Sequence, residues 1–284
     1  MVTKQVTLSQ GPVARLRSPQ FVRSGKTAVG GAVAQVGEMA VLLWEVLCSA
    51  VTRPTGYWGN VRTVSFDILR MNAIPIFVAL PVFGMDAPGV VGGGLFNLFG
   101  MPERLGSFFM MASVREFAPF INMMIIAGVT GTAITADLGA RRIREEFDAM
   151  EVLGVDPVRE IILPRIVALT IMTGLYDVIS LTLGVMGGVL AELQLKANVS
   201  GFFASFWANA TTTEMWTSVV KSSLYGLLIG IICCYKGYRA SGGPAGVGRA
   251  VNQAVVISFA FIWNVHFLFT SVMLGLNPDM MVYR

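Results

Sequence analysis

The chain has 284 residues, of which 54% are hydrophobic and only 13% are charged, and its mean hydropathy is +0.66. This composition excludes an ordinary soluble domain of this size and predicts a protein that resides in a bilayer. The net charge of +4 would suit a nucleic-acid partner, but the basic residues lie beside apolar stretches rather than along one face, so we expect no nucleic acid. The three cysteines have neither an even-numbered framework nor metal-site spacing, so we expect no disulfide scaffold.

Residues 1–56 are expected to form an N-terminal cytoplasmic segment with one interfacial helix. The first 26 residues are polar and basic, without the apolar core of a signal peptide. The stretch Lys26–Ala50 is moderately apolar but carries a glutamine and two glutamates, which favours a helix lying on the membrane over a full crossing. Arg53–Arg70 contains a proline, glycines, the aromatic pair Tyr57 and Trp58 and three arginines, a composition typical of the water interface. We therefore expect an elbow there.

Five transmembrane crossings are predicted to follow, so the fold class is an all-α polytopic membrane protein. The predicted crossings are 72–99, 107–135, 161–190, 217–235 and 254–276. The first contains three prolines and Asp86. Prolines remove backbone hydrogen bonds that hydrocarbon cannot replace, so this segment is expected to face protein. Glycines at 92–94 and 184–188 allow close helix approach and are the expected contact chemistry of a dimer.

The long charged run Asp137–Arg165 interrupts the apolar sequence between the second and third crossings. Within it, Ile143, Phe147 and Met150 recur at the spacing of one helical face, which predicts a short amphipathic helix over 141–153. Gly154 is expected to cap this helix in the left-handed conformation. Two interpretations are open: an element lying in the lipid interface, or a plug that docks into a partner protein.

The orientation of the chain follows from its basic residues. Most of the 21 Lys and Arg residues fall before the first crossing, in the run 137–165 and in the link 236–249. The cytoplasmic side usually carries this excess, so we expect the N-terminus and the charged run in the cytoplasm and the C-terminus outside.

Several chemical motifs can be set aside. Gly25-Lys26-Thr27 has the end of a phosphate-binding loop, but Gln20 stands where that loop needs a glycine, so this chain is not expected to hydrolyse ATP. His266, the only histidine, lies in an apolar run without cysteines or paired carboxylates nearby. We expect a hydrogen-bonded interior histidine rather than a catalytic or metal site.

Ionisable residues inside the predicted crossings are more informative, because each costs roughly 2.5–3.5 kcal/mol at mid-bilayer. They are Asp86, Arg115, Glu116, Asp177 and Lys221. Two interpretations are open for them: internal ion pairs that only fix helix packing, or groups that line a transport route.

The segments REFAP at 115–119 and AGVTGTAITADLGARRIREEFDAMEVLGVDPVREIILPR at 127–165 resemble the MlaE/YrbE family of permeases, which belong to ABC-type lipid (Mce) transporters. The similarity continues to the link at 246–250 and covers roughly residues 57–276. The stretch TADLGARRIREEFDA at 135–149 is similar to the B-type YrbE subunits in particular.

The resemblance implies a permease domain over 57–284 whose segment 137–157 is the coupling helix that contacts a separate ATPase. The expected contacts are Arg141, Arg142, Ile143, Glu145, Glu146, Phe147, Met150 and Glu151. Arg115, Glu116 and Lys221 match polar positions that line the family's translocation cavity. Val129 and His266 stand where many relatives carry an arginine and an acidic residue, so lipid contact is not carried over to them.

The resemblance also implies partners. It predicts an A-type YrbE permease chain, cytoplasmic ATP-binding subunits that hold ATP and Mg, and Mce substrate-binding proteins. The chain itself is expected to bind no cofactor and to be no enzyme. It is expected to help import a fatty acid, sterol or other lipid across the inner membrane. The alternative is an ion-coupled secondary transporter that titrates Asp86, Asp177 or Glu116.

Overall fold

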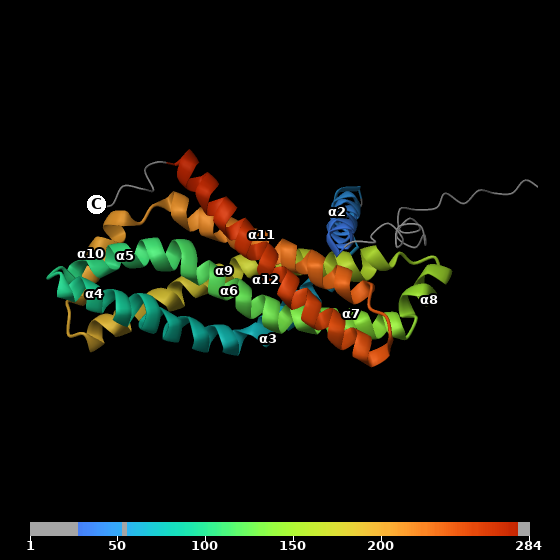
Figure 1. The fold of residues 1–284 in the computed structure, drawn as a ribbon, viewed down its shortest axis with the longest axis horizontal. Helices are drawn as coiled ribbons and strands as arrows, with labels where there is room; N and C mark the ends of the chain where they lie inside the picture. Colours follow the sequence, from blue (N-terminus) through green and yellow to red (C-terminus); the bar gives the residue numbers. More distant parts are fainter. Residues whose placement is uncertain (1–27, 53–55, 278–284) are drawn as a thin grey trace, which may run out of the picture. The chain divides into compact units, whose positions relative to one another are not determined.

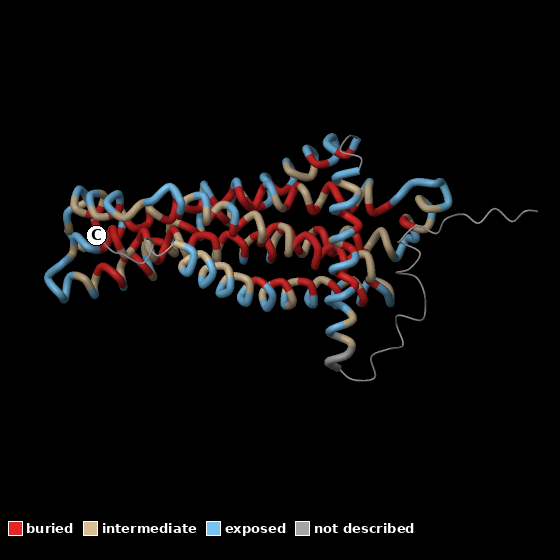
Figure 2. Tube along the Cα trace, turned by 90° about the horizontal axis from the view of Figure 1, so that it is seen from above, coloured by how far each residue is buried: buried red, intermediate tan, exposed pale blue. Residues whose placement is uncertain are grey.

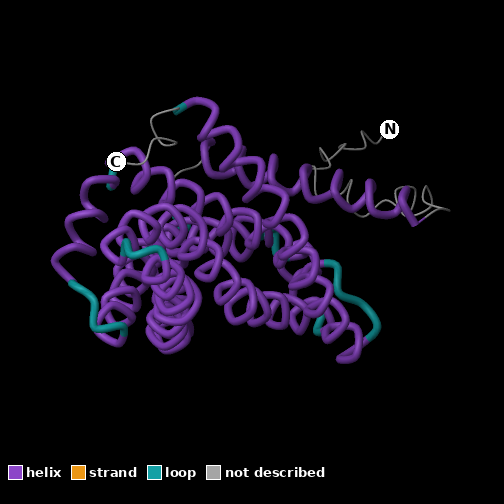
Figure 3. Tube along the Cα trace, turned by 60° about the vertical axis from the view of Figure 1, so that its left-hand side comes forward, coloured by secondary structure: helices purple, strands orange, loops and turns teal. Residues whose placement is uncertain are grey.

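The computed structural model describes residues 28–52 and 56–277 and divides the chain into two units. The described part of the first unit is helix α2 (Ala28–Thr52), and the second, from Gly56 on, is a helical bundle. The described residues form helices and loops, with no strand (Figure 3). Six helical segments are long and apolar enough to cross a membrane, which confirms the predicted all-α polytopic class. One of the six, Val33–Thr52, belongs to α2, whose interfacial position stays a prediction.

The bundle is built from long rods in which α-helical pieces continue through short π-helical or 3₁₀ turns (Figure 1). In chain order the elements are α3 (Trp58–Gly84), η2 (Met85–Val91), α4 (Gly92–Leu98), η3 (Pro102–Arg104), α5 (Leu105–Phe109), η4 (Met110–Phe117), α6 (Ala118–Ile126), η5 (Ala127–Gly131), α7 (Thr132–Ile143), α8 (Glu146–Val152), η6 (Val158–Ile162), α9 (Leu163–Gln194), α10 (Val199–Asn209), α11 (Thr212–Tyr238) and α12 (Gly243–Leu276).

Helix α9 lies at the centre of the bundle. It packs against α3 on one side and α11 on the other, and α11 in turn contacts α7 and α12. The buried residues run along these central helices, whereas α12 is mostly exposed (Figure 2). Helix α8 lies at one end of the bundle, and α4, α5 and α10 lie at the other (Figure 1).

The predicted elbow over Arg53–Arg70 is wrong, because α3 already begins at Trp58. No helix-breaking residue follows Gly59 until Pro75, and a chain entering a bilayer gains by closing its backbone hydrogen bonds early. The expectation that the first crossing faces protein holds for only one of its sides. The other side exposes Ile74, Phe77 and Val82 by 55–75%.

Glycines bring α3 and α9 into close contact. A Cβ added to Gly84 would lie 2.5 Å from the carbonyl oxygen of Gly184, and one added to Gly187 would lie 2.3 Å from that of Pro81. Small residues let helix backbones approach in this way. The glycines at 184–188, expected to serve a dimer, are therefore used for packing inside this chain.

Replacing Gly187 with alanine is expected to destabilise the bundle by roughly 1–3 kcal/mol, because the new methyl group meets the α3 backbone, which cannot move aside. Gly94→Ala is the matched control, since nothing lies within 4 Å of its added Cβ and alanine is the better helix former. Thermal unfolding in detergent should show a lower midpoint for Gly187→Ala and an unchanged or higher one for Gly94→Ala. Equal midpoints would refute the close contact.

Candidate functional site

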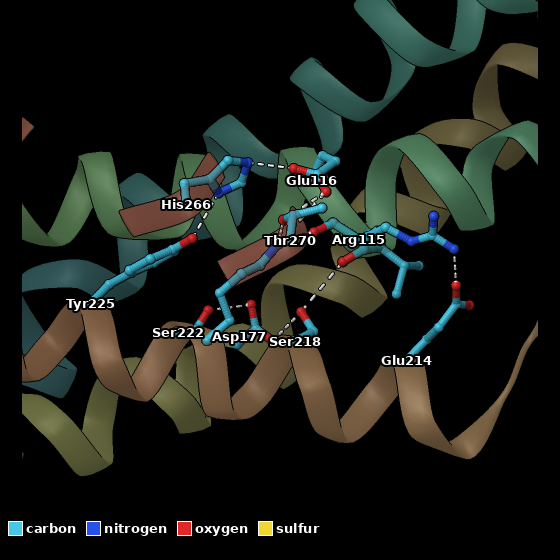
Figure 4. Close-up of polar contacts among 11 residues, drawn as sticks. Arg115, Glu116, Asp177, Glu214, Ser218, Ser222, Tyr225, His266 and Thr270 are labelled. Atoms are coloured by element: carbon cyan, nitrogen blue, oxygen red, sulfur yellow. Dashed lines mark hydrogen bonds and ion pairs between the residues drawn. The ribbon is translucent and has the colours of Figure 1, made fainter. Parts of the chain in front are cut away.

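A cluster of polar side chains lies within the bundle where η4, α9, α11 and α12 meet (Figure 4). We call it the polar cluster. Its members are Arg115, Glu116, Asp177, Glu214, Ser218, Lys221, Ser222, Tyr225, His266 and Thr270.

Arg115 and Glu214 form a buried ion pair between η4 and the first turn of α11. Their side chains are only 11% and 4% exposed. Thr211 caps α11 by accepting a hydrogen bond from the backbone N–H of Glu214 at 3.3 Å, which fixes where Glu214 enters the helix. The pair neutralises both charges inside an apolar bundle, where an unpaired charge would be costly.

Lys221 is almost completely buried, with its side chain 2% exposed. Its ammonium group donates to the backbone carbonyl of Arg115 and to the hydroxyl of Thr270, the latter at 3.4 Å. The nearest carboxylate is that of Glu116, 3.9 Å away. Lys221 therefore ties α11 to η4 and α12, and its charge is balanced within the chain.

The Glu116 carboxylate links η4 to α12. One oxygen accepts from Thr270 at 3.1 Å, and the other is in contact with His266 Nε2. His266 Nδ1 lies 2.7 Å from the hydroxyl of Tyr225. Both ring nitrogens of His266 are thus held, Nδ1 by Tyr225 and Nε2 by Glu116. The predicted hydrogen-bonded histidine is confirmed.

Asp177 is fully buried and joins α9 to α11. Its two carboxylate oxygens accept hydrogen bonds from Ser218 and Ser222, each at 2.8 Å. Asp86, in contrast, lies in η2 on the exposed side of the first long rod and outside the cluster. Of the three carboxylates considered for ion coupling, Glu116 and Asp177 therefore lie in the polar cluster, whereas Asp86 does not.

A small hollow of about 10 Å³ adjoins the cluster between α11 and α12. It is lined by Arg115, Glu214, Thr217, Ser218, Lys221, Phe269, Thr270, Met273 and Leu274. A hollow of this size has room for about one water molecule, whereas pockets that enclose a drug-sized ligand span about 300–1,000 Å³, so it does not enclose a lipid.

The sequence predicted three members of the cluster as route candidates, and the structure brings these together. Arg115 and Lys221 are buried with partners inside the chain, which favours the ion-pair interpretation for them. Glu116 differs, because 31% of its side chain is exposed. Ser218, Ser222 and Tyr225 were not predicted from the sequence. Together with Lys221 they nevertheless follow the i, i+3, i+4, i+7 spacing of a single side of α11.

The charged loop departs from the predicted single helix over 141–153. Helix α7 ends at Ile143 and α8 begins at Glu146, with Glu145 between them at a φ of 57°. Gly154 closes α8 with a φ of 77°, so the predicted left-handed cap is confirmed.

Phe147 is buried within this chain, and its role as a docking anchor stays a prediction. Phe147 is 0% exposed, and its ring packs on that of Tyr238 with centroids 5.1 Å apart. The break between α7 and α8 lets this side chain pack back onto α11. The side chains exposed at the end of α8 are instead Val152 and Leu153, at 88% and 78%.

Most of the charged residues expected to contact an ATPase are paired within the chain. Arg141 contacts Asp137 and Glu146, Arg142 contacts Asp148, and Arg144 contacts Glu146. A further pair joins Arg165 to Asp137 at 2.6 Å and connects the start of α9 to α7. These partly exposed pairs hold the loop in one shape rather than leaving its charges for a partner.

Long apolar helices with paired charges inside the bundle define a polytopic membrane protein. A family model described as "Permease MlaE" matches residues 65–272. A probable ABC transporter permease protein of Rickettsia typhi is 30% identical over 230 residues, which cover 80% of this chain and 88% of that protein. The intermembrane phospholipid transport system permease protein MlaE of Haemophilus influenzae is 26% identical over 213 residues, 73% of this chain and 80% of that protein.

The chain belongs to the MlaE permease family. The predicted membership is thereby confirmed, and with it the prediction of a permease embedded in a membrane. The likeness to B-type YrbE subunits stays a prediction.

Proposed function

We propose that the chain is one half of the membrane-spanning part of an ABC-type lipid transporter, driven by separate ATP-binding subunits. The observation that carries this proposal is the match to the MlaE permease family over 65–272, together with the bundle of membrane-length helices. The Haemophilus relative is named for phospholipid transport, which supports a lipid as the substrate class.

The energy of ATP reaches the chain at the tip of α8 in this proposal. Val152 and Leu153 are the most exposed large apolar side chains of this loop, and the ion pairs of the loop hold them in place. An exposed apolar pair on a braced loop fits a shallow hydrophobic pocket on a partner. ATP and Mg belong to that partner.

Glu116 is the residue of the polar cluster best placed to meet the substrate. Arg115 and Lys221 hold the surrounding helices through buried contacts, whereas the Glu116 carboxylate is partly open to the outside of the bundle. A lipid passing along this side of the chain would meet an acidic group held by His266 and Thr270.

The finer points of the proposal rest on the resemblance. The second permease half is an A-type YrbE chain, Mce proteins deliver the substrate, and the substrate is a fatty acid, sterol or other lipid that is imported. The N-terminus lies in the cytoplasm and the C-terminus outside, as the distribution of basic residues supports.

The test is to express the chain alone and with an A-type partner and its ATPase, and to measure complex mass, ATP hydrolysis and lipid transfer in proteoliposomes. We expect coupled activity only with the heteromeric complex, and lower transfer at normal complex abundance for Glu116→Gln. A stable, transport-competent homodimer would contradict the pairing. Lipid uptake that follows a proton gradient without any ATPase would favour the ion-coupled alternative.

A further inference from the structure

A groove of about 690 Å³ runs along the first turns of α3, where this helix meets α9. It shares no residue with the polar cluster. Its lining residues are Gly59, Arg62, Thr63, Ser65, Phe66, Leu69 and Met172. The groove therefore combines one cationic side chain and two hydroxyls with an apolar floor.

Arg62 is the cationic group of this groove. Its side chain is exposed, and the structure gives it no ion pair or hydrogen bond within the described residues. This is unlike Arg141, Arg142, Arg144 and Arg165 at the same end of the bundle, each of which has a carboxylate partner. An unpaired guanidinium beside apolar surface leaves room for an anionic ligand, and guanidinium forms strong hydrogen bonds with phosphate.

The backbone supports the same ligand chemistry. Gly59 lies in the first turn of α3, a helix of 27 residues, where N–H groups lack partners in the helix and the dipole favours an anion. A Cβ on Gly59 would have no atom within 4 Å, so the backbone is open there. Arg62 follows one turn later, so the guanidinium and the helix start offer positive potential at one end of the groove.

The polar and apolar groups of the groove follow a fixed order along α3. The stacked rings of Tyr57 and Trp58, 5.4 Å apart, lie at the start of α3, as is typical of the membrane interface. Asn60 donates to the backbone carbonyl of Glu160, so this start lies at the end of the bundle that carries the charged loop. Phe66 and Leu69 follow further along the helix, 64% and 42% exposed. The order from interface to interior is cationic, then apolar, as in a phospholipid.

We propose that this groove binds an anionic phospholipid of the leaflet at the charged end of the bundle. Its phosphate lies between Arg62 and the start of α3, and its acyl chain follows Phe66 and Leu69 toward Met172. The Ser65 hydroxyl is placed to donate to the glycerol ester region. This lipid is a resident ligand that stabilises the α3–α9 contact, and the inference goes beyond the transport proposed above.

The test uses the full-length chain purified in detergent and compares its thermal midpoint with added phosphatidylglycerol or phosphatidylcholine. Both lipids supply acyl chains, so the difference between them reports the headgroup. We expect a larger rise with phosphatidylglycerol, and retention of this lipid in native mass spectrometry. Arg62→Gln should weaken its binding about tenfold or more, the loss of one charge-assisted hydrogen bond. Arg70→Gln is the matched control, because Arg70 is exposed on the same helix but does not line the groove.

Two further measurements show whether a rise in the thermal midpoint comes from a bound lipid or from a free anion. Glycerol phosphate alone should not raise the midpoint, because it lacks the acyl chain, and a rise with it would overturn a lipid site in favour of a free anion site. Met172→Trp should fill the inner part of the groove and reduce the response to both lipids. Equal midpoints with the two lipids would overturn the proposal. An equal loss in Arg62→Gln and Arg70→Gln would do the same.

Discussion

Replacing Arg115 with methionine is expected to lower the free energy of unfolding by about 3–5 kcal/mol, the usual cost of removing one partner of a buried ion pair. Glu214 would remain 4% exposed and without its guanidinium partner inside the bundle. The double variant Arg115→Met with Glu214→Leu should recover most of the loss, because it removes both charges and leaves an apolar contact. Chemical unfolding in detergent, compared across the single and double variants, measures this.

The same experiment decides between the two interpretations of Arg115. If the pair only fixes helix packing, the double variant should also regain lipid transfer in proteoliposomes. A double variant that is stable but inactive would instead show that Arg115 acts in the route. Arg70→Met, at an exposed position on α3, controls for the loss of a positive charge and should leave stability within about 0.5 kcal/mol.

The membrane location of the protein and its long helices could be predicted because both depend on composition. Hydrocarbon requires long apolar helices whatever their neighbours, so runs of apolar residues locate the crossings. The start of α3 at Trp58 could not be found this way. Its first turns carry Arg62, Asp67 and Arg70, and a hydropathy pattern treats such charges as the end of a membrane segment although the helix continues through the interface.

The polar cluster shows a different limit. The free-energy cost of a charged side chain in the bilayer showed that Arg115, Glu116 and Lys221 need partners. It did not show which partners they have. Arg115 and Glu214 are 99 positions apart, and only the packing of η4 against α11 brings them together. Helical periodicity did not predict the burial of Phe147 within the chain, for a related reason. It placed Phe147 on an apolar face correctly, but the break at Glu145 decides that this face covers Tyr238 rather than a partner.

Phe147 and Leu153 therefore provide a paired prediction about the charged loop. Phe147→Asp is expected to unfold the loop and to lower the yield of folded permease, because it places a charge at a 0% exposed position and removes an aromatic contact, a loss of at least about 3–5 kcal/mol. Leu153→Asp is expected to leave the permease as stable as the wild type, since this side chain is 78% exposed. Loss of an apolar anchor should nevertheless weaken binding of the ATP-binding subunit roughly thirtyfold or more.

The readouts are the thermal midpoint of the purified permease and the amount of ATP-binding subunit that co-purifies with it. Val155→Asp serves as the positional control, because Val155 lies beyond the Gly154 cap and is only 38% exposed. A change specific to Leu153 places the contact at the tip of α8. A Leu153→Asp permease that retains its ATPase fully would move the coupling surface elsewhere, and a stable Phe147→Asp permease that loses the ATPase would restore Phe147 as the anchor. The burial of Phe147 against Tyr238 makes the first outcome the expected one: the tip of α8 touches the partner, while Phe147 holds the tip in position.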